Sequence, residues 1–289
     1  MTGRTGSHRW LVTGAGGMLG ADLLDVLAGE DVVGLTRGDL DVTDAAAVTA
    51  AVDGRDVVVN AAAWTDVDGA ERAEAAATRV NGDGPRVLAD ACLAAGARLV
   101  HVSTDYVFDG KASTPYAEGH PTAPASAYGR SKLRGEEAVR SVLPESSCVV
   151  RTAWLYGQHG GNFVRTMINL EGQRDTLDVV DDQLGQPTWT LDLANQIVAL
   201  VRADAPAGVY HATSSGETTW CGLARAVFEE LGADPARVRA TTTDRFPRPA
   251  PRPAYSVLGH DAWKRADVEP IGDWRAALAQ AFPRLRSSA

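Results

Sequence analysis

The sequence predicts an α/β protein in which helices cover both faces of a doubly wound parallel sheet. Through the first half of the 289 residues, short runs rich in valine and leucine alternate with helical segments, which is the pattern of repeated βαβ units. These runs are continuously apolar, as is typical of strands buried on both faces. Beyond about residue 155 the alternation weakens, and we expect a smaller second lobe there.

The expected elements follow one another in a strand–helix order. A buried strand that runs into a glycine turn comes first, and a glycine–proline sequence at 82–85 is expected to interrupt the longest helix. The strands are expected over residues 9–13, 31–35, 56–60, 98–103 and 147–152. The helices between them are expected over residues 19–27, 44–52, 71–95 and 128–143.

The composition is that of an ordinary soluble globular protein. Hydrophobic residues make up 45% of the chain and charged residues 22%, which argues against disorder. The net charge of −9 provides no basic surface for nucleic acid or for an anionic membrane, although arginines can still bind an anionic substrate locally. We therefore expect neither nucleic acid nor a membrane among the partners.

The cysteines and the N-terminal segment predict a cytoplasmic location. Cys92, Cys148 and Cys221 are odd in number and widely spaced, so we expect no disulfide framework. Residues 1–9 are polar and lack the apolar core of a signal peptide. No apolar run approaches the ~18–20 residues that a transmembrane helix needs.

A tyrosine and a lysine stand four residues apart, at Tyr128 and Lys132, downstream of an apolar run that ends in Ser103 and Thr104. Residues i and i+4 lie on one face of a helix, so the two side chains can act as a pair. A cation beside a phenol lowers the pKa of the phenol and suits it to proton transfer. The Tyr-x-x-x-Lys pattern alone also arises by chance in many helices. Together with the hydroxyls of Ser103 and Thr104 it predicts chemistry at a carbonyl or carbinol.

Three glycines, Gly14, Gly17 and Gly20, follow the first expected strand at three-residue spacing, with Met18 and Leu19 between the last two. Such spacing permits a tight turn, close approach of the backbone to a pyrophosphate, and close packing of helix on strand. The helix N-terminus adds N–H donors for the phosphates. An ordinary flexible turn is the alternative, but the position within a βαβ unit favours a Rossmann-type dinucleotide site.

The end of the second expected strand predicts which dinucleotide binds. An acidic residue at this tip binds the ribose of NAD, whereas an arginine accommodates the 2′-phosphate of NADP. Thr36 and Arg37 come first here and the acids come later, which favours NADPH over NADH. Asp41 and Val42 are expected beside the adenine. The alternative for Arg37 is a solvated surface charge.

The glycine motif and the Tyr-x-x-x-Lys motif together resemble the extended short-chain dehydrogenase/reductase superfamily. Further motifs narrow the resemblance to the dTDP-4-dehydrorhamnose reductase family, over nearly the whole chain. These motifs lie at residues 60–71, 103–110, 151–157, 181–188, 210–211, 218–220 and 252–256.

The resemblance implies that NAD(P)H reduces the C4 ketone of a dTDP-6-deoxy-4-ketohexose, most simply dTDP-4-dehydro-L-rhamnose. It implies that Tyr128 donates a proton to the nascent alkoxide and that Thr104 hydrogen-bonds the carbonyl oxygen. Lys132 would bind the nicotinamide ribose and lower the pKa of Tyr128. We expect residues 1–150 to form the NAD(P)-binding domain. Residues 151–289 would form mainly a substrate-binding lobe, with segments that return to the sheet.

Further site residues are implied by the family's motifs. On the cofactor side these are Ala61, Ala62, Ala63 and Thr65, and on the sugar-nucleotide side Val67, Thr104, Asp105, Tyr106, Tyr128 and Trp154. Core filling is the alternative role for Trp154. Four further residues have two possible roles: they bind the base or phosphates of the substrate, or they are polar surface and helix-capping residues. These are Asn162, Phe163, Gln186 and Arg252.

Some members of the family dimerise around a magnesium ion held by acidic side chains. Asp22 stands where the first acid would fall, but Leu191 and Arg275 occupy the places of the other two. Because a hard cation needs several oxygen ligands, we expect no interface metal and a monomer or weak homodimer.

Other functions use the same residues. A reductase of another dTDP-ketosugar, or of a sugar aldehyde as in the dihydrostreptose pathway, would need the same Thr104, Tyr128 and Lys132. An epimerase or dehydratase of the superfamily is disfavoured by the middle motifs. A non-catalytic NADP-binding regulatory subunit is disfavoured because all three residues are present.

Overall fold

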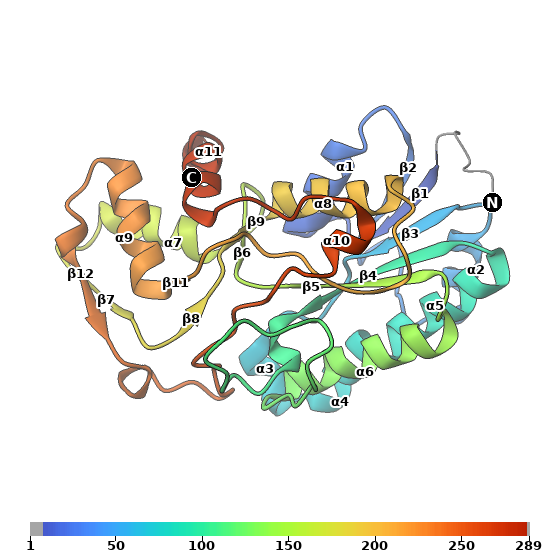
Figure 1. The fold of residues 1–289 in the computed structure, drawn as a ribbon, viewed down its shortest axis with the longest axis horizontal. Helices are drawn as coiled ribbons and strands as arrows, with labels where there is room; N and C mark the ends of the chain where they lie inside the picture. The colour runs from blue at the N-terminus through green and yellow to red at the C-terminus, as the bar shows by residue number, and fades with distance from the viewer. Residues whose placement is uncertain (1–7, 288–289) are drawn as a thin grey trace.

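The computed structural model describes residues 8–287, and its centre is a six-stranded sheet in the order β10-β5-β4-β3-β1-β2 (Figure 1). Every neighbouring pair in this sheet is parallel. Its strands are β1 (Arg9–Thr13), β2 (Asp31–Leu35), β3 (Val57–Asn60), β4 (Arg98–Thr104), β5 (Ser147–Thr152) and β10 (Gly208–His211). The predicted parallel α/β fold is confirmed. Residues 1–7 of the polar N-terminal segment lie outside the described residues.

The order of the strands creates a crevice between β1 and β3. The chain passes from β1 to β2 on one side, and β3 then lies on the other side of β1. Thr13 and Asn60 are the last residues of β1 and β3, and they are partners in register. In open parallel sheets, ligands bind outside the carboxyl ends of the strands at such a reversal point. The predicted glycine turn follows Thr13 and therefore lies at this point.

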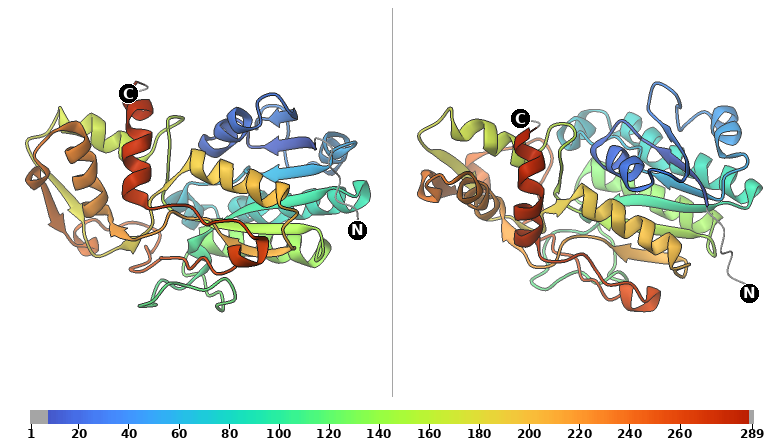
Figure 2. Two further views of the ribbon diagram at one scale, coloured as in Figure 1. Left: turned by 45° about the horizontal axis from the view of Figure 1, so that its top comes forward. Right: turned by 90° about the horizontal axis from the view of Figure 1, so that it is seen from above.

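Helices cover both faces of the sheet (Figures 1 and 2). One face carries α1 (Met18–Val26) and α8 (Thr190–Arg202), which lie side by side. The other face carries α2 (Ala45–Val52), α5 (Gly84–Ala95) and α6 (Ala127–Val142). Of these helices, α1, α2 and α6 match the sequence expectation to within one residue at each end.

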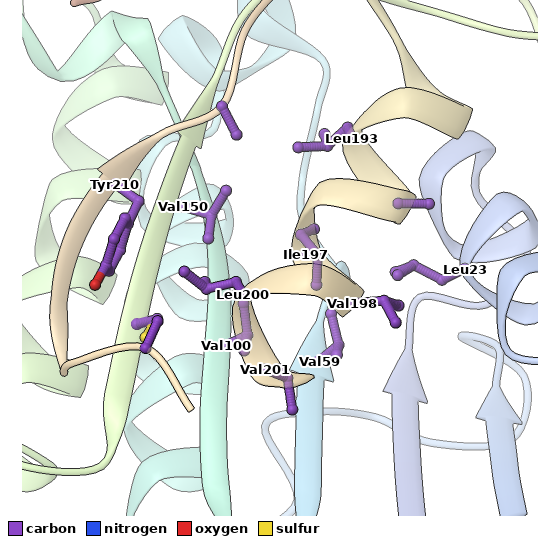
Figure 3. Close-up of a cluster of buried hydrophobic side chains, with 14 of the residues drawn as sticks. Leu23, Val59, Val100, Val150, Leu193, Ile197, Val198, Leu200, Val201 and Tyr210 are labelled. Atoms are coloured by element: carbon purple, nitrogen blue, oxygen red, sulfur yellow. The ribbon is translucent and has the colours of Figure 1, made fainter. Parts of the chain in front are cut away.

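The valines of β3 show why the strands must be apolar throughout. Val57 and Val59 pack into the cluster beneath α1 and α8, whereas Val58 packs into the cluster on the opposite face. Figure 3 shows Val59 with Val100 of β4 and Val150 of β5 facing the side chains of α8. Because successive residues of a strand point to opposite faces, a strand between two helical layers has no solvent-facing side.

The helix expected over residues 71–95 is the main departure from the sequence expectation. The structure divides this path into α3 (Val67–Arg72), α4 (Glu74–Thr78), a wider π-helical turn (Arg79–Asp83) and α5. The path begins earlier than expected because Asp66 caps Gly69 N at 2.8 Å. The break at Ala73 has a φ of −137°, and Pro85 lies in the first turn of α5, where its missing N–H costs no helical hydrogen bond.

The second lobe lies beyond one end of the sheet (Figure 2). Its larger elements are α7 (Phe163–Glu171), β7 (Leu177–Val180), α9 (Trp220–Leu231), β12 (Val238–Thr241) and α11 (Trp274–Ser287). Short strand pairs link it to the sheet: β6 (Leu155–Tyr156) with β9 (Thr188–Trp189), and β8 (Leu184–Gly185) with β11 (Thr218–Thr219). The remaining short helices are Asp105–Val107, Pro235–Arg237, Thr243–Arg245 and α10 (Trp263–Ala266).

Two segments of the second half pack with the sheet. Strand β10 pairs with β5 at the sheet edge, and α8 packs on the sheet beside α1. The division of the chain at residue 150 stays a prediction. Among the described helices, none has the length and apolar content needed to cross a bilayer.

Candidate active site

The glycine turn between β1 and α1 depends on the absence of two side chains. Gly14 has a φ of +71°, and a Cβ placed there would lie 2.6 Å from Ala62 N. A Cβ at Gly20 would collide with Gly14 O, so α1 can begin this close to β1 only with glycine at that position. Gly17 N donates to Gly14 O at 2.9 Å and closes the turn. The N-terminus of α1 therefore lies beside the carboxyl ends of β1 and β3.

Two cavities meet at this turn. The first, which we call the β2-side cavity, has a volume of about 550 Å³ and reaches from the turn to the end of β2. The second, which we call the catalytic cavity, has a volume of about 640 Å³ and reaches from the turn to β4, α6 and the second lobe. Residues that line both include Gly16, Gly17, Ala61, Ala63 and Thr65.

The structure brings together every residue predicted to bind the cofactor. The β2-side cavity is lined by Gly14, Gly17, Thr36, Arg37, Asp41, Val42, Ala61, Ala62, Ala63 and Thr65. The catalytic cavity is lined by Gly17, Met18, Leu19, Gly20, Ala61, Ala63, Thr65, Tyr128 and Lys132. The two cavities together form a continuous cleft along the carboxyl edge of the sheet, with the glycine turn at its middle.

The carboxylates near the end of β2 accept hydrogen bonds from neighbouring residues of the chain. Asp39 accepts hydrogen bonds from Thr36 N at 2.9 Å and from Thr36 Oγ1 at 2.6 Å, and these bonds lower the pKa of Asp39. Asp41 accepts in the same way from Thr43 N and Thr43 Oγ1, which lowers the pKa of Asp41. The carboxylates are therefore held in local turns.

Arg37 and Arg79 both line the β2-side cavity, and neither guanidinium has a hydrogen-bond or ion-pair partner within residues 8–287. Arg79 is the first residue of the π-helical turn and was not identified from the sequence. No local motif marks Arg79, because its approach to Arg37 depends on the path of the chain between α4 and α5. Two guanidinium groups that line one cavity have the charge and geometry that suit a doubly charged anion.

The catalytic cavity contains the three residues predicted to act in catalysis. Tyr128 lies in the first turn of α6, which Ser126 caps by accepting from Gly129 N at 3.0 Å. Thr104 ends β4, and its hydroxyl donates to Asp105 Oδ1 at 2.8 Å. Lys132 lies one turn after Tyr128, and its Nζ donates to Val102 O at 2.7 Å.

Close packing fixes the position of Tyr128 relative to the end of β4. A Cβ at Gly129 would collide with Tyr106 O, so glycine lets α6 approach the turn after β4. The ring of Tyr106 meets the ring of Tyr128 edge to face, with centroids 5.6 Å apart. These contacts hold the Tyr128 hydroxyl in the cavity that Thr104 also lines.

Burial disfavours the charged forms of both Tyr128 and Lys132. Burial raises the pKa of Tyr128, the charge of Asp105 raises it further, and the Thr104 hydroxyl only partly offsets this. Burial also lowers the pKa of Lys132 to about 8. The Lys132 ammonium is directed at Val102 O, and desolvation disfavours the charged forms of both side chains. The expectation that Lys132 lowers the pKa of Tyr128 stays a prediction. Tyr128 is protonated at neutral pH, as a proton donor must be.

Asp105 is the second titratable group of the cavity. It is 3% exposed, and burial raises its pKa to about 6 in spite of the hydrogen bonds that favour its ionised form. Because Thr104 donates to this carboxylate, the protonation of Asp105 controls the direction in which the Thr104 hydroxyl points.

A buried polar network supports the floor of the cleft. Asn60 Oδ1 accepts from Thr13 Oγ1 at 2.7 Å and from Ala62 N at 3.1 Å, and Asn60 Nδ2 contacts His101 Nδ1 at 3.0 Å. These bonds join the ends of β1 and β3 to the middle of β4, next to the alanines that line the cavities. The polar end of an otherwise apolar strand is the sequence signal for Asn60.

Asn81 gives the cleft wall a second support. Its side chain bonds to both backbone groups of Trp64, with Trp64 N donating to Asn81 Oδ1 at 2.8 Å. Asn81 Nδ2 also donates to Ser131 Oγ at 3.0 Å and so ties this segment to α6. Nothing in the local sequence singles out Asn81, because its partners come from two distant segments.

The predicted substrate residues Val67, Thr104, Asp105, Tyr106 and Trp154 also line the catalytic cavity. Trp154 additionally packs against the core of the second lobe, so core filling does not conflict with its predicted contact with the sugar nucleotide. Trp220 lines the same cavity and was not among the predicted site residues.

The four residues with two possible roles, Asn162, Phe163, Gln186 and Arg252, have different surroundings in the structure. Asn162 caps α7 by accepting from Arg165 N at 3.1 Å. Gln186 is buried and accepts from Leu258 N at 2.8 Å. Arg252 pairs with Asp68 at 2.9 Å and lines a separate cavity of about 270 Å³ together with Tyr106. Phe163 packs against Trp220, with ring centroids 4.7 Å apart.

Asp22, Leu191 and Arg275, the residues considered for an interface metal, do not line the catalytic cavity. Asp22 is 2% exposed, and ligand atoms of Asp22, Asp25 and His159 all lie within 4.8 Å of one another. Arg275 is engaged by Glu229 and Glu230. The absence of an interface metal stays a prediction.

The chain is similar over nearly its whole length to known sugar-nucleotide reductases. Residues 8–287 match the family described as RmlD substrate binding domain. A dTDP-4-keto-6-deoxy-D-glucose reductase from Streptomyces niveus is 57% identical, over 97% of this chain and 99% of that protein. A dTDP-4-dehydrorhamnose reductase from Mycobacterium tuberculosis is 50% identical, over 98% and 94%. The structure of a dTDP-4-dehydrorhamnose reductase from Bacillus anthracis in complex with NADP superposes with a TM-score of 0.92 at 34% identity, over 96% and 99%.

Proposed function

This chain belongs to the RmlD substrate-binding-domain family, that of the dTDP-4-dehydrorhamnose reductases, and we propose from this premise that it reduces the C4 ketone of dTDP-4-dehydro-L-rhamnose to dTDP-L-rhamnose with NADPH. One observation carries the proposal: Thr104, Tyr128 and Lys132 line a single cavity that begins at the glycine turn. A hydroxyl pair and a dinucleotide turn in one cavity suit the reduction of a carbonyl.

The residues of the cleft fit the cofactor. The space beside Gly14 and Gly17, at the N-terminus of α1, suits a pyrophosphate, because backbone N–H groups and the helix dipole favour an anion there. Arg37 and Arg79 suit the 2′-phosphate that distinguishes NADPH from NADH. When bound, NADPH supplies the hydride that adds to C4 of the sugar.

Side chains of the protein stabilise the C4 oxygen of the sugar and supply its proton. As the C4=O double bond becomes a single bond, negative charge collects on the oxygen, and hydroxyl donors stabilise it most in the transition state. We assign the proton transfer to Tyr128, whose O–H bond breaks as the alkoxide becomes the alcohol. Thr104 is assigned the second hydrogen bond to that oxygen, and Lys132 is assigned the nicotinamide ribose.

Product identification tests the proposal. Purified protein incubated with NADPH and dTDP-4-dehydro-L-rhamnose is expected to oxidise NADPH and to yield dTDP-L-rhamnose by NMR. No oxidation of NADPH with any dTDP-ketosugar would sink the proposed function, and would favour the non-catalytic NADP-binding alternative.

A second candidate substrate is dTDP-4-keto-6-deoxy-D-glucose, because a 57% identical relative from Streptomyces niveus is named as its reductase. The same Thr104 and Tyr128 would serve, because the reacting group is again a C4 ketone. A comparison of kcat/KM for the two ketosugars decides between them: the higher value identifies the preferred substrate.

Arg37 and Arg79 are predicted to determine the preference for NADPH. Hydrogen bonds to a charged group contribute about 1.5–3 kcal/mol each, so Arg37→Ala or Arg79→Ala should raise the KM for NADPH by ~10–100-fold. The KM for NADH should change little, because NADH has no 2′-phosphate. Steady-state kinetics with both cofactors provide the measurement.

Arg72→Ala is the matched control for these two arginine variants. Arg72 is exposed in the same helical region, at the end of α3, but lines neither cavity. An equal loss of affinity for NADPH and NADH in Arg79→Ala would contradict the assignment to the 2′-phosphate.

Asp105 is predicted to make ketone reduction dependent on pH near 6. Burial raises its pKa to about 6, so the carboxyl is mainly protonated below that pH and ionised above it. Ionised Asp105 accepts the Thr104 proton over 2.8 Å and turns it away from the substrate oxygen. Protonated Asp105 instead donates to Thr104 Oγ1 and frees that proton. We therefore expect kcat/KM to fall as the pH rises through about 6.

The variant Asp105→Asn is expected to lose this inflection in a pH profile of kcat/KM. The decline near pH 8, where Lys132 with its pKa of about 8 loses its proton, should remain and serves as the internal control. Persistence of the inflection near pH 6 in the variant would show that another group titrates there.

We further propose a monomer or weak homodimer without an interface metal, located in the cytoplasm. Leu191 and Arg275 at two of the three relevant positions support the absence of the metal, and three buried free cysteines support a reducing compartment. Light scattering should give the same mass with and without Mg²⁺. A dimer that forms only with Mg²⁺, or recovery of the protein from an exported fraction, would contradict these assignments.

A further inference from the structure

Trp154 has a backbone conformation that is rare for a bulky residue. Its φ is +47°, in the left-handed region, where a side chain is strained against its own backbone. The residue lies between β5 and β6, and its carbonyl oxygen accepts a hydrogen bond of 3.2 Å from Thr188 N. Strain of this kind persists only where the surrounding contacts require it.

Two residues of other segments hold the Trp154 indole. The ring of Trp220 stacks on it with centroids 3.7 Å apart and planes 9° from parallel. Gly185 lies against the same indole so closely that an added Cβ would be 2.5 Å from Trp154 Cε2. The pairing of Gly185 with Thr218 in β8 and β11 brings this glycine next to Trp220.

Trp220 is itself anchored in the second lobe. It is the first residue of α9, directly after Thr219, which caps the helix by accepting from Gly222 N at 2.9 Å. Trp220 Nε1 donates to Gln183 Oε1 at 3.1 Å, and Gln183 Nε2 donates to Thr243 Oγ1 at 2.9 Å. A polar network of the lobe therefore fixes the orientation of the Trp220 ring.

The stacked pair joins the two lobes at the catalytic cavity. Trp154 follows β5 of the sheet, Trp220 begins a helix of the lobe, and both line the cavity that contains Thr104 and Tyr128. A flat indole in such a place can pack against the apolar C–H face and methyl group of a 6-deoxysugar. The contact would orient the ketone toward the two hydroxyls.

We propose that Trp220, together with Gly185, is a positioning residue that holds Trp154 in its left-handed conformation as the platform for the sugar ring of the substrate. This inference rests on the proposed function for the identity of the ligand. Trp220 acts through Trp154, and loss of the stack lets the strained backbone relax and moves the indole away from the sugar. The cofactor site contains neither indole in its β2-side half.

Binding and kinetics with Trp220→Ala and Trp220→Phe test the inference. Trp220→Ala should raise the KM for the ketosugar and weaken binding of dTDP-L-rhamnose, measured by calorimetry, about tenfold. The KM for NADPH should be unchanged. Trp220→Phe keeps a flat ring on Trp154 and should restore most of the affinity, whereas Trp220→Leu, apolar but not planar, should not.

Gly185→Ala tests the other side of the indole, and Gly172→Ala is its matched control. Gly172 lies in the same lobe, and a Cβ there would meet nothing within 4 Å. Gly185→Ala should reproduce the loss of sugar affinity, and Gly172→Ala should behave as wild type. Circular dichroism provides a readout that needs no ligand: the exciton couplet of two stacked indoles should disappear in Trp154→Phe and Trp220→Phe alike.

The possible outcomes separate the inference from the proposed function. Wild-type affinity for dTDP-L-rhamnose in Trp220→Ala, or an equal loss of affinity for NADPH, overturns the inference. Wild-type protein that binds dTDP-L-rhamnose but reduces no dTDP-ketosugar overturns the proposed function alone. Wild-type protein that does not bind dTDP-L-rhamnose overturns both.

Discussion

Replacement of Tyr128 by phenylalanine is expected to lower kcat for ketone reduction by ~10²–10⁴-fold, the usual contribution of a positioned general acid. Tyr128 lines the catalytic cavity, and desolvation raises the pKa of its hydroxyl, so it holds its proton until the substrate oxygen becomes basic. Phenylalanine keeps the ring and its edge-to-face contact with Tyr106, so the fold and NADPH binding should be retained. Single-turnover kinetics with pre-bound NADPH provide the measurement.

Tyr156→Phe is the matched control for this variant. Tyr156 is 1% exposed, does not line the catalytic cavity, and its hydroxyl has no hydrogen-bond partner in the described part of the chain. Loss of this hydroxyl should leave kcat at the wild-type value. A decrease in Tyr128→Phe no larger than that in Tyr156→Phe would show that another group supplies the proton.

Replacement of Gly14 by alanine is expected to have the largest effect on stability. The added Cβ would lie 2.6 Å from Ala62 N and 2.7 Å from Ala61 O, and the φ of +71° disfavours any side chain. Backbone strain and overpacking each cost about 1–3 kcal/mol, so the free energy of unfolding should fall by about 2–6 kcal/mol. NADPH binding should be lost as well, because relief of the clash must separate the ends of β1 and β3. Denaturant unfolding and a cofactor titration provide the measurements.

Gly16→Ala, two residues away in the same turn, is the control for stability. A Cβ at Gly16 would lie 3.5 Å from Thr36 Cγ2, an ordinary van der Waals distance, and Gly16 does not have a positive φ. Its free energy of unfolding should stay within about 1 kcal/mol of wild type. Equal destabilisation by the two substitutions would mean that the turn is simply intolerant of side chains.

The secondary structure of the sheet region was predictable because both faces of each strand are buried. The run Val57–Val59 must be apolar at every position, and a continuous run is easy to recognise. The helix expected over residues 71–95 was less accurate. The interruption expected at residues 82–85 corresponds to the wider turn at Arg79–Asp83, whereas the break at Ala73 was not expected. The bonds of Asn81 to Trp64 and Ser131 join the wider turn to distant segments.

Many residues of the predicted site could also be named from the sequence. Local spacing identified the glycine turn and the Tyr128–Lys132 pair, and the family resemblance supplied most of the others. The predicted cofactor residues and the predicted substrate residues line the two adjoining cavities. The residues that sequence reasoning missed, Arg79 and Trp220, act with partners from remote segments. Arg79 and Arg37 line the same β2-side cavity. Trp220 of the second lobe stacks on Trp154, which follows the sheet strand β5.

The sequence by itself determined the glycine turn and the pairing of Tyr128 with Lys132 on one helix, because these depend on neighbours along the backbone. It also indicated the family of the chain, through motifs spread over nearly its whole length. Only the tertiary structure decided how those groups are charged. Burial and Asp105 raise the pKa of Tyr128, and Lys132 directs its proton at Val102 O. The physical reason is that solvent exclusion and Coulomb interactions depend on distance in space, which spacing along the chain does not specify.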